Sequence, residues 1–142
     1  MAKNTGKTSE SLFESSIEHL GKAAYLYRFP DAAEVRGRTG KIGFVRPAPS
    51  DYLVSMSGMF FLAEVKSTQD QTAFRFSLLR KTQSAHARMA WSAGALYFIF
   101  LHDLTRNQWY RIPYSFVEDW KRDTGRSSVP WKNLEAFKYE LP

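Results

Sequence analysis

Hydrophobic side chains recur at helical spacing in three parts of the chain. Apolar positions between Thr8 and Arg28, followed by Pro30, predict an N-terminal helix. A second helix is predicted for residues 77–93, with Ser77 as its cap and Gly94 as its stop. The inward faces expected for these two helices comprise Leu12, Phe13, Ile17, Leu20 and Ala24 in the first, and Leu78, Leu79, Thr82, Ala85 and Met89 in the second.

The third helix follows a capping-box pattern, Ser115-Phe-Val-Glu118, and is expected to end at Gly125. Beyond it, a tail is expected to pack through Trp131, Leu134 and Phe137. Short aromatic and β-branched runs between the helices predict strands. These strands are expected at Ile42–Val45, Asp51–Met56, Met59–Lys66, Ala95–Leu101 and Trp109–Ile112.

The predicted order, α-β-β-β-α-β-β-α, is that of an α/β (α+β) protein with a mixed sheet flanked by helices. The 142 residues suit one domain with a single core. We expect residues 1–8 to be flexible and residues 36–48, which are rich in Gly, Pro and basic side chains, to form a basic loop or arm.

Two carboxylates are placed together by the strands on either side of Ser57-Gly58. If these two residues form a hairpin turn, Met56 faces Met59 and Asp51 faces Glu64, because the numbers of facing residues have a constant sum. Like charges in such positions repel each other and require a cation between them. Lys66 is one candidate cation, and a divalent ion with oxygen ligands is the other. A solvated hairpin end, with Lys66 paired to Glu64, remains the alternative.

Composition favours a polyanionic partner. The net charge is +6, and nine basic residues against three acidic ones lie between Arg36 and Arg88. Such a basic block with interspersed aromatic residues is typical of nucleic-acid binding, with an anionic membrane surface as the second possibility. Charge alone equally allows a soluble protein with a high pI and no such partner. The absence of cysteine excludes disulfides and thiolate sites. There is no apolar signal segment, and no apolar run approaches the ~20 residues of a membrane helix, so we expect a cytoplasmic protein without a membrane partner.

Pro49-Ser50-Asp51 followed by Glu64-Val65-Lys66 resembles the signature of the PD-(D/E)xK nuclease superfamily. From about Ser9 to the C-terminus, the layout of elements is similar to that of RecU-type and archaeal-type Holliday junction resolvases. The resemblance implies a restriction-endonuclease-like fold and a Mg²⁺- or Mn²⁺-dependent endonuclease that cuts four-way DNA junctions by paired symmetric nicks. It also implies a homodimer with two active sites. A phage origin would suit the short chain.

The resemblance implies that Asp51 and Glu64 bind the metal together with the backbone carbonyl of Val65. Lys66 positions the attacking water, and Glu14 completes the site, although Glu10 and Glu18 lie one turn away on the same helix. Gln83 orients Lys66 or the scissile strand. The expected DNA-binding residues are Arg36, Arg38, Lys41, Arg46, Ser67, Thr68, Arg75, Arg80, Lys81 and Arg88.

Two other functions remain open at this point: a nuclease of the same superfamily with another DNA substrate, nicking or restriction-like, and a branched-DNA-binding protein without catalysis. A nucleotide cofactor is not expected. Gly6-Lys7-Thr8 ends like a phosphate-binding loop, but the leading glycine and the preceding strand are missing. The three histidines have no metal-ligand spacing.

Overall fold

The computed structural model describes residues 5–30 and 47–142 of the chain. Its centre is a six-stranded sheet in the order β1-β2-β3-β5-β6-β8. The strands are β1 (Ala24–Arg28), β2 (Tyr52–Met56), β3 (Met59–Thr68), β5 (Leu96–Asp103), β6 (Gln108–Pro113) and β8 (Lys138–Tyr139). Neighbouring strands are antiparallel except β3 and β5, which are parallel and central. Two short strands, β4 (Ala73–Arg75) and β7 (Ser128–Pro130), form a separate antiparallel ribbon.

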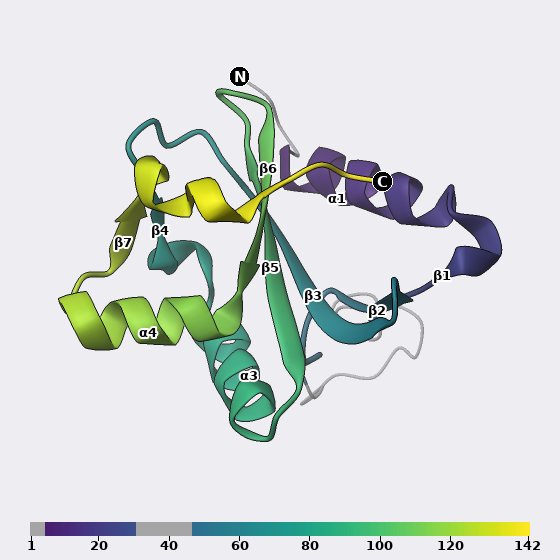
Figure 1. The fold of residues 1–142 in the computed structure, drawn as a ribbon, viewed down its shortest axis with the longest axis horizontal. Coiled ribbons are helices and arrows are strands. Elements are labelled where there is room, and N and C mark those ends of the chain that lie inside the picture. Colours follow the sequence, from purple (N-terminus) through teal and green to yellow (C-terminus); the bar gives the residue numbers. More distant parts are fainter. Residues whose placement is uncertain (1–4, 31–46) are drawn as a thin grey trace, which may run out of the picture.

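Helices cover the two faces of the sheet. Figure 1 shows α1 (Thr5–Glu18) on one side and α3 (Lys81–Ser92) with α4 (Tyr114–Thr124) on the other. A parallel connection between β3 and β5 needs a crossover segment, and α3 provides it. Short 3₁₀ turns at Gly21–Ala23, Phe76–Leu78 and Trp131–Phe137 complete the described elements.

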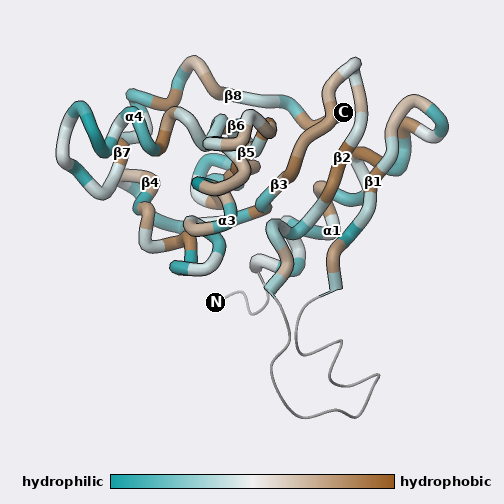
Figure 2. The backbone as a smooth tube through the Cα atoms, turned by 90° about the horizontal axis from the view of Figure 1, so that it is seen from below, coloured by the Kyte–Doolittle hydropathy of each residue, from teal (hydrophilic) through white to brown (hydrophobic). Residues whose placement is uncertain are grey.

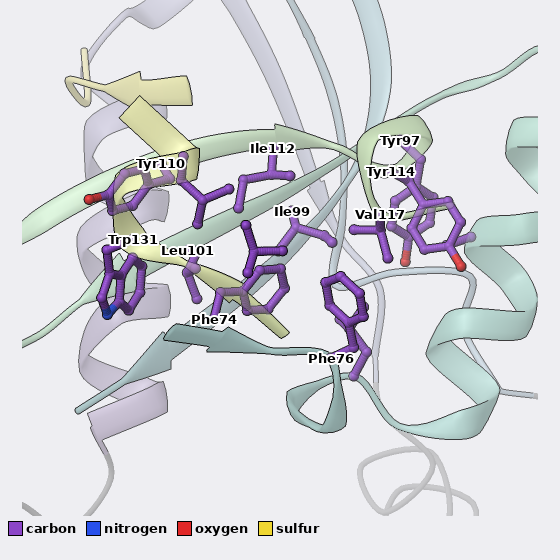
Figure 3. Packing of buried hydrophobic residues seen from close by; sticks show 14 residues of the cluster. Phe74, Phe76, Tyr97, Ile99, Leu101, Tyr110, Ile112, Tyr114, Val117 and Trp131 are labelled. Atoms are coloured by element: carbon purple, nitrogen blue, oxygen red, sulfur yellow. The ribbon is translucent and has the colours of Figure 1, made fainter. Parts of the chain in front are cut away.

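Side-chain alternation along the strands supplies two separate cores. On the α1 side, Phe13 and Ile17 pack against strand residues that include Val54 and Phe61. On the other side, Ile99 and Ile112 lie within a cluster that is closed by residues of α4, the β4–β7 ribbon and the C-terminal segment. Figure 3 shows this second cluster, and Figure 2 shows the apolar colouring concentrated in the strands.

The predicted N-terminal helix is wrong in its second half. The chain leaves the helix after Glu18, turns through Gly21 at φ +59°, and continues as the strand β1. The alternation in Ala24-Tyr-Leu-Tyr-Arg28 suits a strand, and pairing with β2 settles the choice. Leu12, expected to face inward, is 46% exposed, whereas Phe13 and Ile17 form the buried face.

The starts of the other two helices also differ from the prediction. Residues 77 and 78 belong to a 3₁₀ turn, and α3 begins only at Lys81 after Arg80 as N-cap. Ala87 is buried in α3 while Met89 is 60% exposed, so the helix is rotated from the expected face. The N-cap of α4 is Pro113 rather than Ser115, because β6 leads directly into the helix; its predicted end at Gly125, with φ +68°, is confirmed.

The α+β class with a mixed sheet and flanking helices is confirmed. Trp131 and Leu134 of the tail are buried as expected, and the tail also adds β7 and β8. The helix α1 already includes residues 5–8, the end of the segment expected to be flexible. The predicted strand at Ile42–Val45 and nearly all of the expected basic loop lie outside the described residues. Among the described helices, none has the length and apolar character needed to cross a membrane.

Candidate active site

The hairpin that carries the acid pair forms with the predicted register. Met56 pairs with Met59, and Tyr52 with Ala63 is the last pair of the ladder. The turn residues Ser57 and Gly58 have φ values of +53° and +75°, as a two-residue turn with positive φ at both positions requires. Asp51 and Glu64 therefore follow the last pair at the open end of the hairpin.

Asp51 and Glu64 lie together at this end, within hydrogen-bond reach of each other. The Oδ2 atom of Asp51 accepts a hydrogen bond of 2.9 Å from the backbone N–H of Val65. Glu64 is only 1% exposed, and the ammonium group of Lys66 lies 3.8 Å from its Oε2 atom. The predicted motif residues are thus brought to one place.

Two further side chains hold Glu64. Gln83, at the start of α3, donates from Nε2 to the Oε2 atom of Glu64 at 2.7 Å. Tyr97, on β5, lies with its hydroxyl oxygen 3.3 Å from Oε1. Gln83 was expected to orient Lys66 or the scissile strand, and in the structure its amide contacts the carboxylate of Glu64. Tyr97 is a residue of this site that the sequence did not reveal.

Simultaneous ionisation of Asp51 and Glu64 is energetically unfavourable. Burial is the main cause that raises the pKa of Glu64 to about 8, and the charge of Asp51 adds to it. Burial also raises the pKa of Asp51, although the N–H of Val65 opposes this shift. Without a further cation, the pair therefore keeps a shared proton near neutral pH.

The acid pair borders a cleft of about 180 Å³, whose lining also includes Arg80, Thr82 and Gln83. A larger groove of about 640 Å³ lies elsewhere, beside Trp109, and has a single acidic side chain among its lining residues. The smaller cleft is the better candidate site because two carboxylates, an arginine and a helix start converge on it.

The acidic residues of α1 have different surroundings. Glu14 accepts a hydrogen bond of 2.5 Å from the hydroxyl of Tyr52, and Arg28 lies 3.6 Å from the same oxygen. Arg28 also lies 3.8 Å from Glu10. Burial and, next, the charge of Asp51 raise the pKa of Glu10, so this carboxylate lies in the field of the site.

The carboxylates of Asp51 and Glu64 are the charged oxygen donors at the centre of the site. Within residues 5–30 and 47–142, no group of three or more His, Cys, Asp or Glu side chains is placed to hold a metal ion. Mg²⁺ does not need such a cage, because it binds proteins through one or two carboxylates and takes its other ligands from water and phosphate. The donor set fits a hard divalent ion.

The expected DNA-binding residues fall into four groups. Arg36, Arg38, Lys41 and Arg46 lie outside the described residues. Arg75 lies 2.6 Å from Asp70 and Arg88 lies 3.4 Å from Glu118, so both have acidic partners. Arg80 and Lys81 are exposed at the start of α3. Ser67 and Thr68 end β3, and the Thr68 hydroxyl accepts a hydrogen bond from the backbone N–H of Asp70.

The fold as a whole is similar to that of a solved archaeal protein. Hjc from Archaeoglobus fulgidus, described as a Holliday junction resolvase from an archaeal hyperthermophile, matches with a TM-score of 0.60 over 97% of this chain and 93% of its own. The sequence identity is 13%, so the likeness establishes the fold.

The family is established by sequence. A profile of the RecU family, described as recombination protein U, matches residues 32–142, and the chain belongs to this family. The Holliday junction resolvase RecU of Staphylococcus aureus strain JH9 is 26% identical over 102 residues, which are 70% of this chain and 49% of that protein. RecU of strain MRSA252 matches with the same identity and coverage. The chain thus spans about half the length of these curated relatives.

Replacement of Glu64 by Gln is expected to stabilise the metal-free protein at high pH. The raised pKa of Glu64 means that its stabilising contribution is complete below about pH 4.5 and is lost as the pH rises through about 8. Above pH 8, with EDTA present, the variant should be more stable by up to about 5 kcal/mol. Denaturant unfolding at pH 5 and pH 9 measures the difference, which should be near zero at pH 5.

The exposed residue Glu140 supplies the matched control, because Glu140→Gln removes a charge from the surface. A glutamine at position 64 can accept from Gln83 and donate to the Tyr97 hydroxyl, so the surrounding hydrogen bonds have partners. A Glu64→Gln protein that is equally destabilised at both pH values would contradict the assignment of a strained carboxylate.

Proposed function

We propose that this chain is a divalent-metal-dependent endonuclease that resolves four-way DNA junctions. The observation that carries the proposal is the convergence of Asp51, Glu64 and Lys66 at one end of a hairpin, in the order of the resembled nuclease motif. Membership of the RecU family supports it, as do the names of the curated relatives, which are Holliday junction resolvases.

In this proposal, Asp51, Glu64 and the carbonyl oxygen of Val65 hold Mg²⁺ or Mn²⁺. Such an ion, when bound, stabilises charge on the phosphoryl oxygens and lowers the pKa of water. Lys66, next to Glu64, supplies a second positive charge and orients the attacking water. Gln83 keeps Glu64 in place through its amide hydrogen bond.

The start of α3 is proposed to bind the DNA backbone. Arg80 and Thr82 line the cleft beside the carboxylates, and Lys81 is exposed next to them. Backbone N–H groups at a helix start and basic side chains both favour phosphate. The other expected cations, from Arg36 to Arg46, are proposed to extend this surface.

Resolution of a junction requires two cuts related by symmetry. We therefore propose a two-fold homodimer with one acid pair in each subunit. We also propose that the protein acts in the cytoplasm, where its DNA substrate is found.

The central test uses a synthetic four-way junction with Mg²⁺ or with EDTA. We expect paired symmetric nicks only with metal, and Asp51→Asn should reduce the cleavage rate by at least about 100-fold, because loss of a ligand should cost more than loss of an outer contact. The affinity of this variant for the junction in EDTA should remain within about threefold of wild type. Junction binding is measured by fluorescence anisotropy.

Each alternative has its own outcome in this experiment. Equal cleavage of linear duplex would indicate a nicking or restriction-like enzyme. Binding without product at any metal concentration would indicate a binding protein without catalysis. Loss of DNA affinity in Asp51→Asn, matching its loss of cleavage, would contradict the metal assignment.

Glu10 and Glu14 are expected to behave differently when replaced by Gln. Because the charges of Glu10 and Asp51 repel each other, Glu10→Gln removes a negative charge near the site and should weaken Mn²⁺ binding by about threefold. Glu14→Gln should leave Mn²⁺ affinity nearly unchanged but cost about 1–2 kcal/mol of stability, since Tyr52 and Arg28 lose a charged partner. Calorimetric titration and denaturant unfolding measure the two effects.

Glu18→Gln is the control, because Glu18 is exposed at the end of α1. If Glu14→Gln weakened Mn²⁺ binding and Glu10→Gln did not, Glu14 would be the residue that completes the metal site, as the sequence resemblance implies.

Arg80→Ala should weaken junction binding and reduce the slope of log K against log salt concentration by about 1, as removal of one phosphate contact does. The measurement is a salt titration of junction affinity in EDTA. Arg122→Ala provides the control, because Arg122 lies on α4 with Asp119 and Asp123 as partners. An unchanged slope for Arg80→Ala would remove this residue from the DNA-binding surface.

A further inference from the structure

Tyr97 joins the two halves of the acid-pair motif through one hydroxyl group. The hydroxyl oxygen lies 3.0 Å from the carbonyl oxygen of Pro49 and 3.3 Å from the Oε1 atom of Glu64. Pro49 begins the Pro49-Ser50-Asp51 segment, and Glu64 begins the Glu64-Val65-Lys66 segment. Tyr97 belongs to neither segment and comes from β5.

The parallel pairing of β3 with β5 places Tyr97 on the required face. Tyr97 pairs with Leu62 and Ile99 pairs with Glu64, so alternate residues of both strands project to the same side. The side chain of Tyr97 can therefore extend along this face from the Leu62 level to the carboxylate of Glu64. A shift of one residue in this pairing would turn Tyr97 to the α1 side of the sheet.

The ring of Tyr97 is fixed by its packing. The residue is 4% exposed, and its ring meets that of Tyr114 edge to face, with centroids 6.0 Å apart. Figure 3 shows these two rings side by side at one end of the buried cluster. Because the ring has little freedom, the position of its hydroxyl is set by the core rather than by the solvent.

The two oxygens of Glu64 have different donors. Gln83 donates to Oε2, and among the hydrogen bonds of the described residues Tyr97 is the side-chain donor to Oε1. The single hydroxyl proton of Tyr97 is shared between this oxygen and the nearer carbonyl oxygen of Pro49. Burial, and then the charge of Glu64, raises the pKa of Tyr97, so that its hydroxyl retains the proton that it donates. One donor at each oxygen restricts rotation of the carboxylate.

We infer that Tyr97 is a positioning residue of the metal site, which holds Glu64 and the segment leading to Asp51 at the separation that lets both carboxylates bind one divalent ion. This inference rests on the proposed metal-dependent function. Tyr97 does not touch the ion or the DNA in this role; it acts through Glu64 and through the Pro49 carbonyl.

The test replaces Tyr97 by Phe, which keeps the buried ring and removes only the hydroxyl. Mn²⁺ binding to the DNA-free protein is measured by calorimetric titration, and junction cleavage is measured as a function of Mn²⁺ concentration. We expect the dissociation constant for Mn²⁺ and the concentration for half-maximal cleavage to rise together by about 10-fold. Cleavage at saturating Mn²⁺ should return to within about threefold of wild type, and junction affinity in EDTA should be unchanged.

Tyr114→Phe is the matched control. It removes a hydroxyl from the neighbouring buried ring, whose partner is Glu118 rather than a site carboxylate. We expect its Mn²⁺ affinity to match that of wild type. A second measurement, the rise in Tm on addition of Mn²⁺, compares each variant with its own metal-free form and so separates metal binding from a change in overall stability.

Each outcome is decisive. Wild-type Mn²⁺ affinity in Tyr97→Phe overturns the role of Tyr97 and leaves the proposed nuclease function intact. Equal weakening in Tyr97→Phe and Tyr114→Phe also overturns it, because a general effect of core packing would then explain both. A wild-type protein that neither binds Mn²⁺ nor cuts the junction overturns the proposed function, and this inference falls with it.

Discussion

The central constraint on this site is that ionising both of its carboxylates at once is energetically unfavourable. Asp51 and Glu64 meet where the hairpin ladder ends, and burial together with mutual repulsion makes their joint ionisation costly. The surrounding groups are almost all donors or cations: the N–H of Val65, the amide of Gln83 and the ammonium of Lys66. Such an arrangement is destabilising in isolation and becomes favourable once a divalent charge is shared between the two acids.

The parallel pair β3–β5 explains why so many elements meet at one carboxylate. The β3 strand carries Glu64, and the chain must then cross over before it can run parallel to itself, which brings the start of α3 beside the site. The returning strand brings Tyr97 to the other oxygen of the same carboxylate. The contacts of Glu64 with Lys66, Gln83 and Tyr97 therefore come from β3, α3 and β5, all within one continuous stretch of the chain, residues 59–103.

Much of the site centre could be predicted from the sequence because it depends on a tight turn. Ser57-Gly58 fixes the hairpin register, and the facing positions of Asp51 and Glu64 follow from counting. The turn works although serine rarely adopts φ near +53°, because the apolar face of the hairpin specifies the same register. The position of Lys66 beside Glu64 could be predicted in the same way, because Lys66 lies two residues beyond Glu64 on the same face of the strand.

The remaining parts depend on contacts that a local pattern does not contain. Residues 24–28 satisfy a helical apolar spacing but become β1 because the edge of β2 is available for pairing. The surroundings of Glu10 and Glu14 depend on Arg28, which β1 brings back to α1. Tyr97 lies in a hydrophobic run whose sequence predicts only a buried strand. The contacts of its hydroxyl depend on the parallel register of β5 with β3, which the sequence does not show.

Gln83 shows how the local and the functional requirements are combined in one residue. Its Oε1 atom accepts a hydrogen bond of 2.9 Å from the backbone N–H of Arg80, which closes the first turn of α3, while its Nε2 atom donates to Glu64. The predicted cap at Ser77 was wrong because the helix begins where this glutamine can serve both partners. A side chain with one acceptor and one donor group can do this, whereas glutamate could not donate to Glu64 unless it were itself protonated. The start of α3 and the position of the site carboxylate are therefore set by the same amide, so a shift of either would move the other.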